Sequence, residues 1–340
     1  MSIKKIRYIV ILFLLTLLAA AGFAYLSASV RKSENAAETA KKLQSAFPEI
    51  ITLTKADFVR LDRTIQKEGP ERAWEFLKTS SLKKNDFHFL THFLGRRIYE
   101  KFGLGGLRFC GVEFGGFGCY HSIVSSAVAE HGENAVEDIR NACFRLNAEA
   151  KVNACLHGTG HGFSEFTGYK LLPALGYCDI LKKDEQFKCW EGVFMEQIIS
   201  APKSFYKPED PWYPCHDIPQ KYQDLCIRRQ PAIMMNQLGL DLQTSTHICL
   251  TAPTAKMTSA CAAGIAFRIA VLSDGNNPFV LEKCRTLFDT LTRQQECISG
   301  AAESMIKEHL RDWQNLAPLL CDELTAEHKK ECKLRIKPGA

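Results

Sequence analysis

The chain has 340 residues, of which 46% are hydrophobic, and its formal net charge at neutral pH is +5. This composition supports a sizeable folded core, and the small charge, without a dense block of lysine and arginine, argues against nucleic acid as a partner. The unusual feature is the fourteen cysteines, because so many in one chain are typical of disulfide-bonded, exported proteins.

The first segment in chain order, residues 1–30, is predicted to be a transmembrane helix. Lys4, Lys5 and Arg7 precede an apolar run from Tyr8 to Ala28. At about 1.5 Å per residue this run can cross a hydrocarbon core of about 30 Å. Cleavage as a signal peptide is the alternative, although the apolar region of a signal peptide is usually shorter. In both cases the basic end stays in the cytoplasm and the rest of the chain is exported.

We therefore predict a single-pass protein of the cell membrane with most of its mass in the periplasm or outside the cell. The membrane is its predicted partner through the N-terminal helix, and no later stretch is expected to be long and apolar enough to span again. Residues 31–53 are interpreted as a juxtamembrane linker and residues 54–340 as the exported domain. Within that domain, 54–85 form a cysteine-free cap of two helices separated by Gly69-Pro70, 86–200 a histidine-rich half, and 201–340 the C-terminal repeats.

The cysteines recur as seven pairs, with 9 to 13 residues inside a pair and a period of roughly 35 residues between pairs. The predicted pairs are Cys110 with Cys119, Cys143 with Cys155, Cys178 with Cys189, Cys215 with Cys226, Cys249 with Cys261, Cys284 with Cys297, and Cys321 with Cys332. Such a period marks stacked supersecondary units, and each unit here is interpreted as a helix, a turn of about ten residues and a second helix. The sequence thus predicts an all-α solenoid of helical hairpins, each closed by a disulfide across its turn.

One repeat carries the motif fragment Ala174-Leu-Gly-Tyr177. Together with the cysteine-paired hairpins, it resembles the cysteine-stapled Sel1-like branch of the tetratricopeptide superfamily, in which disulfides hold helical hairpins together. The resemblance covers residues 86–335 and is one of architecture, since the signature positions of Sel1 repeats are present only in fragments. It implies an all-α repeat fold and a role as a scaffold or adaptor.

Equivalent positions of successive repeats concentrate histidine in the first half of the domain. Counted from Asp86, Cys119, Cys155 and Cys189, the residues two positions on are His88, His121, His157 and Glu191, and those six positions on include His92 and His161. Adjacent helices of a solenoid pack about 8 to 10 Å apart and present equivalent positions to one side, so these side chains are expected to converge. His88 and His92 are four residues apart, and so are His157 and His161. This spacing lets one helix face supply two ligands to a metal ion.

We therefore predict a transition-metal centre. The predicted ligands are His88, His92, His121, His157, His161 and Glu191, and Glu165 and Glu196 are predicted to orient the imidazoles by hydrogen bonds. Imidazole suits iron, copper and zinc, and five rings with a carboxylate exceed one tetrahedral site, so one or two ions are expected. Tyr120 is the candidate catalytic residue, as a relay for protons or electrons beside His121, although tyrosine at such a position more often serves packing.

Three functions are compatible with this pattern, and a metal-dependent oxidoreductase or hydrolase is the preferred hypothesis. The alternatives are a metal storage or delivery protein and a non-catalytic scaffold whose histidines only form hydrogen bonds. The C-terminal repeats lose the histidines and are the predicted surface for a protein or peptide partner. The sequence lacks H-E-x-x-H, G-x-S-x-G and any phosphate-binding loop, so it predicts no particular reaction or substrate.

Overall fold

All regular structure in the described part of the chain is helical, which confirms the predicted all-α class. The computed structural model describes residues 53–337, apart from 81, 83, 113–116, 274, 308, 309 and 311. The predicted transmembrane helix at 1–30 and nearly all of the linker lie outside these residues.

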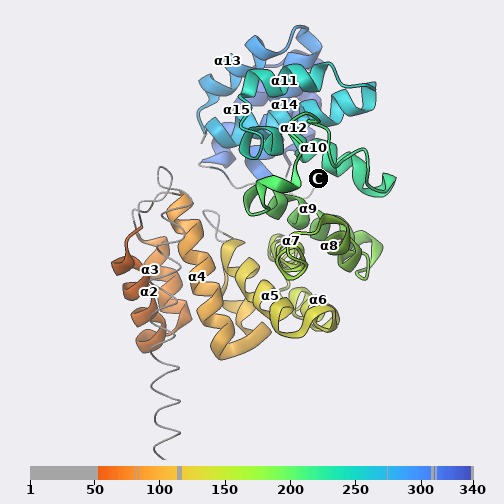
Figure 1. Ribbon diagram of the computed structural model, residues 1–340. Coiled ribbons are helices and arrows are strands. Elements are labelled where there is room, and N and C mark those ends of the chain that lie inside the picture. Colours follow the sequence, from red (N-terminus) through yellow and green to blue (C-terminus); the bar gives the residue numbers. More distant parts are fainter. Residues whose placement is uncertain are drawn as a thin grey trace, which may run out of the picture.

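The helices follow one another in chain order along a curved path (Figure 1). Long helices form its spine: α4 (Lys84–Phe102), α5 (Phe117–His131), α7 (Glu149–Phe166), α9 (Lys183–Ile199), α10 (Gln220–Asn236), α12 (Ala255–Ser273) and α14 (Leu291–Lys307). Shorter helices alternate with them: η1 (Gly103–Phe109), η3 (Gly132–Ala135), α6 (Val136–Phe144), α8 (Leu171–Cys178), η4 (Lys203–Phe205), α11 (Leu242–Leu250) and α13 (Asn277–Leu287). The last hairpin consists of α15 (Trp313–Asp322) and α16 (Ala326–Arg335).

Two helices, α2 (Lys55–Glu68) and α3 (Pro70–Lys78), precede the repeats as the sequence predicts. A capping box starts α2, in which the Thr54 backbone N–H donates to Asp57 Oδ2 at 2.7 Å. Gly69 separates the helices with a φ of 92°, a conformation that glycine adopts at little cost. Pro70 then starts α3, where its missing N–H leaves no helical hydrogen bond unmade.

All seven predicted disulfides form, and no described cysteine is free. Their Cα atoms lie 5.3 to 5.7 Å apart, which is normal spacing for the bond. The bonds join Cys110 to Cys119, Cys143 to Cys155, Cys178 to Cys189, Cys215 to Cys226, Cys249 to Cys261, Cys284 to Cys297, and Cys321 to Cys332. Six of the pairs thus close a hairpin of two helices, whereas Cys215 lies in a series of turns that its bond to Cys226 joins to α10.

The pairing holds to the end of the chain, where the repeats carry no histidine in register. Cys297 on α14 is bonded to Cys284 on α13. Cys332 on α16 is bonded to Cys321 on α15. All four side chains are buried, so these bonds lie inside the core. The disulfides therefore serve the fold in every repeat, whether or not the repeat contributes to the histidine cluster.

The long helices pack closely because a glycine stands three residues after several register cysteines. A Cβ at Gly158 would lie 3.0 Å from His121 Cα, and one at Gly192 would lie 1.9 Å from the His157 carbonyl oxygen. Gly264 repeats the arrangement against the Arg228 carbonyl oxygen at 2.1 Å. Any larger residue would push neighbouring helices apart. These contacts hold equivalent positions of successive units side by side.

One long helix corrects a sequence expectation. By length and composition α12 could cross a membrane, and it is the only helix in the described residues that could. The prediction that no stretch after residue 30 is long and apolar enough was therefore wrong. In the solenoid, however, α12 packs between α10 and α14 and is joined to α11 by Cys249–Cys261. Its apolar residues thus serve contacts between repeats.

Candidate metal centre

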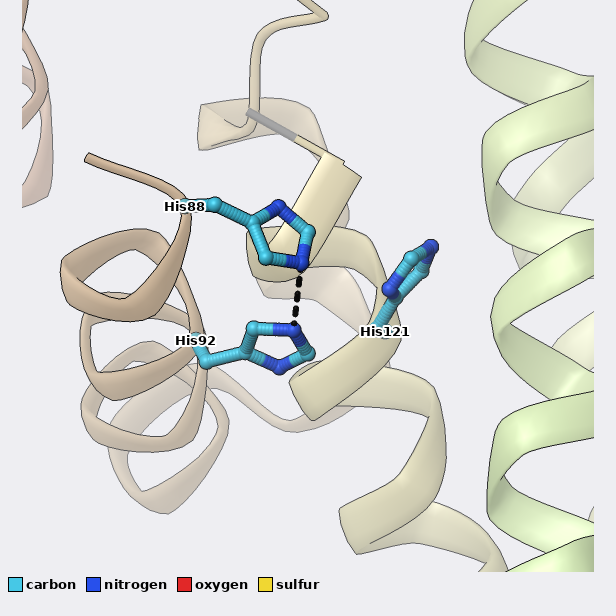
Figure 2. Close-up of side chains that lie close together, drawn as sticks. All are labelled: His88, His92 and His121. Carbon is cyan, nitrogen blue, oxygen red and sulfur yellow. Dashed lines mark hydrogen bonds between the residues drawn. The ribbon is translucent and has the colours of Figure 1, made fainter. Parts of the chain in front are cut away.

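The first part of the centre comes from α4 and α5. His88 and His92 lie one helical turn apart on α4, and their Nε2 atoms are 3.1 Å from each other (Figure 2). His121 lies beside them on α5, with its ring centroid 6.0 Å from that of His88 and 5.5 Å from that of His92. Helix packing thus brings together three histidines that the sequence separates by up to 33 residues.

The second part comes from α7, on the other neighbour of α5. The rings of His157 and His161 have centroids 4.9 Å apart. The His121 ring stacks on that of His161 at 4.4 Å and lies 5.3 Å from that of His157. Five imidazoles therefore form one continuous row across three helices, with His121 in the middle.

The possible donor atoms in this row fall into two overlapping groups. One group is His88, His92 and His121, and the other is His121, His157 and His161. Within each group one donor atom per residue lies within 4.8 Å of the others. Donors that share a zinc ion at about 2.0–2.1 Å stand roughly 3.3 Å apart, so small ring movements would bring each group to coordination distance.

Hydrogen bonds orient two of the rings. His161 Nδ1 lies 2.6 Å from Glu196 Oε2, and His92 Nδ1 lies 3.0 Å from Ser122 Oγ. A carboxylate accepting from Nδ1–H leaves the lone pair on Nε2, as in metal-bound histidine with a carboxylate behind it. Glu196 is thus placed as the sequence predicts for an orienting group. Ser122 was not predicted, and its register position three residues after Cys119 is the only signal that could have indicated it.

Two ring nitrogens in the row are buried and make no hydrogen bond within the described residues. They are Nδ1 of His121 and Nε2 of His161, on side chains whose residues are 4% and 5% exposed. A buried polar atom without a partner costs about 1–3 kcal/mol. Both nitrogen atoms are therefore available to bind a cation, and binding would remove the free-energy cost of leaving them buried without a partner.

Burial keeps three of the imidazoles, those of His92, His121 and His157, neutral. Desolvation, reinforced by the neighbouring histidines, holds the pKa of His121 well below its ordinary value. The residues His92 and His157 are only half-buried, but surrounding protein atoms desolvate their rings and lower the pKa of each in the same direction. The pKa of Glu196 is lowered: burial alone would raise it, but the hydrogen bond and the charge interaction with His161, together with a hydrogen bond from Ser200, outweigh the burial. Neutral imidazole is the form that binds metal ions.

These shifts predict that the metal-free protein loses stability in acid. Because the folded state disfavours protonation of His92, His121 and His157, their contribution is complete above the unfolded pKa of about 6.5. It is lost as the pH falls below that value, by up to about 1.4 kcal/mol per histidine and pH unit. Urea unfolding in the presence of a chelator at pH 7 and pH 5 measures this loss. Changing the three histidines to glutamine should flatten the dependence, and equal stability of the wild type at both pH values would contradict it.

The remaining predicted residues lie around the row. Glu191 accepts hydrogen bonds from Lys188 and Arg229, each at 3.2 Å, and belongs to neither group of donors. Glu165 reaches the surface from α7, but protein atoms around its carboxyl desolvate it and, with the neighbouring Glu196, raise its pKa. The Tyr120 hydroxyl is buried and donates to the Cys110 carbonyl oxygen at 2.7 Å. That contact ties α5 to Cys110, and the relay role of Tyr120 stays a prediction.

Comparisons of the chain with protein-family models, with curated proteins and with solved structures found no match. The Sel1-like resemblance therefore stays a prediction, and the function has to be argued from the site.

Proposed function

We propose that the protein is an exported transition-metal-binding protein whose polyhistidine centre lies on α4, α5 and α7. The observation that carries this proposal is the pair of buried, unpartnered ring nitrogens of His121 and His161 within a row of converging imidazoles. A hydrogen-bonded network of histidines and carboxylates would be expected to satisfy such atoms. Here Glu196 is hydrogen-bonded to Nδ1 of His161, and Nε2 of the same ring has no partner among the described residues.

The donor set favours zinc or copper. Both metals accept three imidazoles, whereas non-haem iron sites usually include a carboxylate ligand. The carboxylate predicted for that role, Glu191, is engaged by Lys188 and Arg229, which leaves a set made of nitrogen atoms alone. Iron is therefore the least favoured of the three predicted metals.

The centre combines buried and half-buried histidines. Of the five histidines, His88, His92 and His157 are half-buried and only His121 and His161 are buried. Three protein ligands leave an open coordination position, as in catalytic zinc sites. We therefore propose metal-dependent redox or hydrolytic catalysis, with delivery of the ion to another protein as the alternative.

The compartment follows from the disulfides. Seven of them point to an oxidising, extracytoplasmic environment, where such bonds form and persist. Attachment to the membrane through residues 1–30, kinship with Sel1-like repeats and a protein partner on the repeats after residue 200 complete the proposal. These three parts are supported by the sequence alone.

Metal analysis tests the proposal. Protein folded in an oxidising compartment should carry one to two equivalents of zinc or copper and regain them after chelation. His121→Gln removes a ligand common to both groups and should weaken metal binding by about 10-fold to 100-fold or more. His131→Gln and His216→Gln, on residues outside the centre, are the matched controls and should retain the metal. A wild type that binds no metal, or a His121→Gln variant that binds it equally well, would refute the proposal.

A further inference from the structure

The five imidazoles do not surround a single point. Within the described residues, their donor atoms gather as two groups of three instead of one group of five. An ion placed among His88, His92 and His121 therefore lies outside the group of His157 and His161. A single ion would leave two histidines of the row without a metal ion to bind.

His121 is the member that both groups share. Its helix, α5, packs against α4 on one side and α7 on the other, so His121 receives the other members of one group from each neighbouring helix. Figure 2 shows the α4 side, with His88 and His92 next to His121. An imidazole ring has two nitrogens that point away from each other, and each can bind a metal ion when its proton is lost. The buried Nδ1 of His121 has no partner in the described residues.

We infer that the centre holds two transition-metal ions at once, bridged by the two ring nitrogens of His121. The inference rests on the proposed metal binding and adds the number of ions and their linkage. When the second ion binds, the remaining ring proton of His121 passes to solvent, and the ring becomes an anionic imidazolate bound to one ion at each nitrogen. That negative charge offsets part of the repulsion between the two cations.

The two ions would not be equivalent. The group on the α7 side has two buried histidines, and the carboxylate of Glu196 orients His161. The group on the α4 side has one buried histidine, and its orienting contact is the neutral hydroxyl of Ser122 on His92. Outer hydrogen-bond partners change metal affinity by about 10- to 100-fold, and a carboxylate strengthens imidazole as a ligand more than a hydroxyl does. The ion on the α7 side is therefore the tighter one, and the ion on the α4 side exchanges first.

Titration of the chelated full-length protein with Cu²⁺ tests the bridge. The wild type should bind two equivalents, the second about 10- to 100-fold more weakly, and the electron paramagnetic resonance signal should fall as the second ion couples to the first through the ring. His88→Gln with His92→Gln should keep only the tight equivalent. His157→Gln with His161→Gln should keep only the weak one. In both double variants the single remaining ion should give an uncoupled signal.

The outcomes separate this inference from the proposed function. One equivalent in the wild type would overturn the two-ion centre and leave metal binding intact. Two equivalents with full, uncoupled signal intensity would overturn the bridge. Binding that persists in both double variants and in His121→Gln would place the copper elsewhere on the protein and overturn the inference and the proposed function together. Chelator-treated variants should keep the helical circular-dichroism spectrum and a cooperative thermal transition, which excludes misfolding as the cause of any loss.

Discussion

Replacing Gly192 by alanine is expected to destabilise the protein by about 1–3 kcal/mol, the usual cost of inserting a methyl group into a packed interface. The added Cβ would lie 1.9 Å from the carbonyl oxygen of His157, a backbone atom that cannot turn aside as the end of a side chain could. Alanine is the better helix former by up to about 1 kcal/mol, but this gain is smaller than the cost of the clash. We therefore expect a net loss.

The same substitution should weaken metal binding. In the wild type, Glu196 Oε2 lies 2.6 Å from His161 Nδ1. Separating α9 from α7 moves the carboxylate away from this ring nitrogen. Loss of such a partner typically lowers metal affinity about 10- to 100-fold. Urea unfolding and metal titration measure the two effects. Gly176→Ala is the matched control, because a Cβ at this position in α8 meets no neighbour within 4 Å and should leave both properties unchanged or slightly raise stability. If the two variants behave alike, the close contact between α7 and α9 does not position the centre.

Reduction of the disulfides is expected to unfold the protein. Each bond closes a loop of 9 to 13 residues and contributes up to about 3 kcal/mol in the chain-entropy model. Seven such contributions, even if only partly additive, are as large as the net stability of about 5–15 kcal/mol that folded domains possess. Circular dichroism with and without a reductant should show the loss of a cooperative thermal transition.

Thiol counting provides the control for that experiment. Protein denatured without reductant should show almost no reactive thiol, because all fourteen cysteines pair. Full reduction should expose all fourteen. A completely reduced protein that keeps its thermal transition would contradict the structural role of the bonds. Many free thiols before reduction would contradict the oxidising compartment.

The sequence predicted the cysteine pairing and the convergence of the histidines for the same reason. A repeat period fixes which residues are equivalent, and stacking in phase brings equivalent residues of neighbouring units together. In this chain Gly158 and Gly192 keep the repeats in register, because their missing side chains let the preceding long helix approach closely. Glu196 could be predicted as an orienting carboxylate because it follows Met195, the position on the adjacent helix that is equivalent to His161.

The partners of individual side chains could not be predicted in this way. Glu191 occupies the register position of His157, yet its carboxylate is bound by Lys188 on its own helix and Arg229 on α10. Arg229 stands one residue away from the equivalent position in the next repeat, so a comparison of register positions alone misses it. The division of five imidazoles into two groups depends on how each ring turns about its side-chain bonds, and residue spacing does not contain that information.

The complete pairing of the cysteines also sets the order in which the protein can mature. An unoxidised chain would present fourteen thiols, and thiolates bind copper(I) and zinc more strongly than imidazoles do. A metal ion arriving early would be captured by sulfur at the hairpin turns and would block the bonds that close them. Oxidation must therefore precede metal binding at the proposed centre, because only a chain whose cysteines are already paired leaves the histidines as the strongest ligands for the ion.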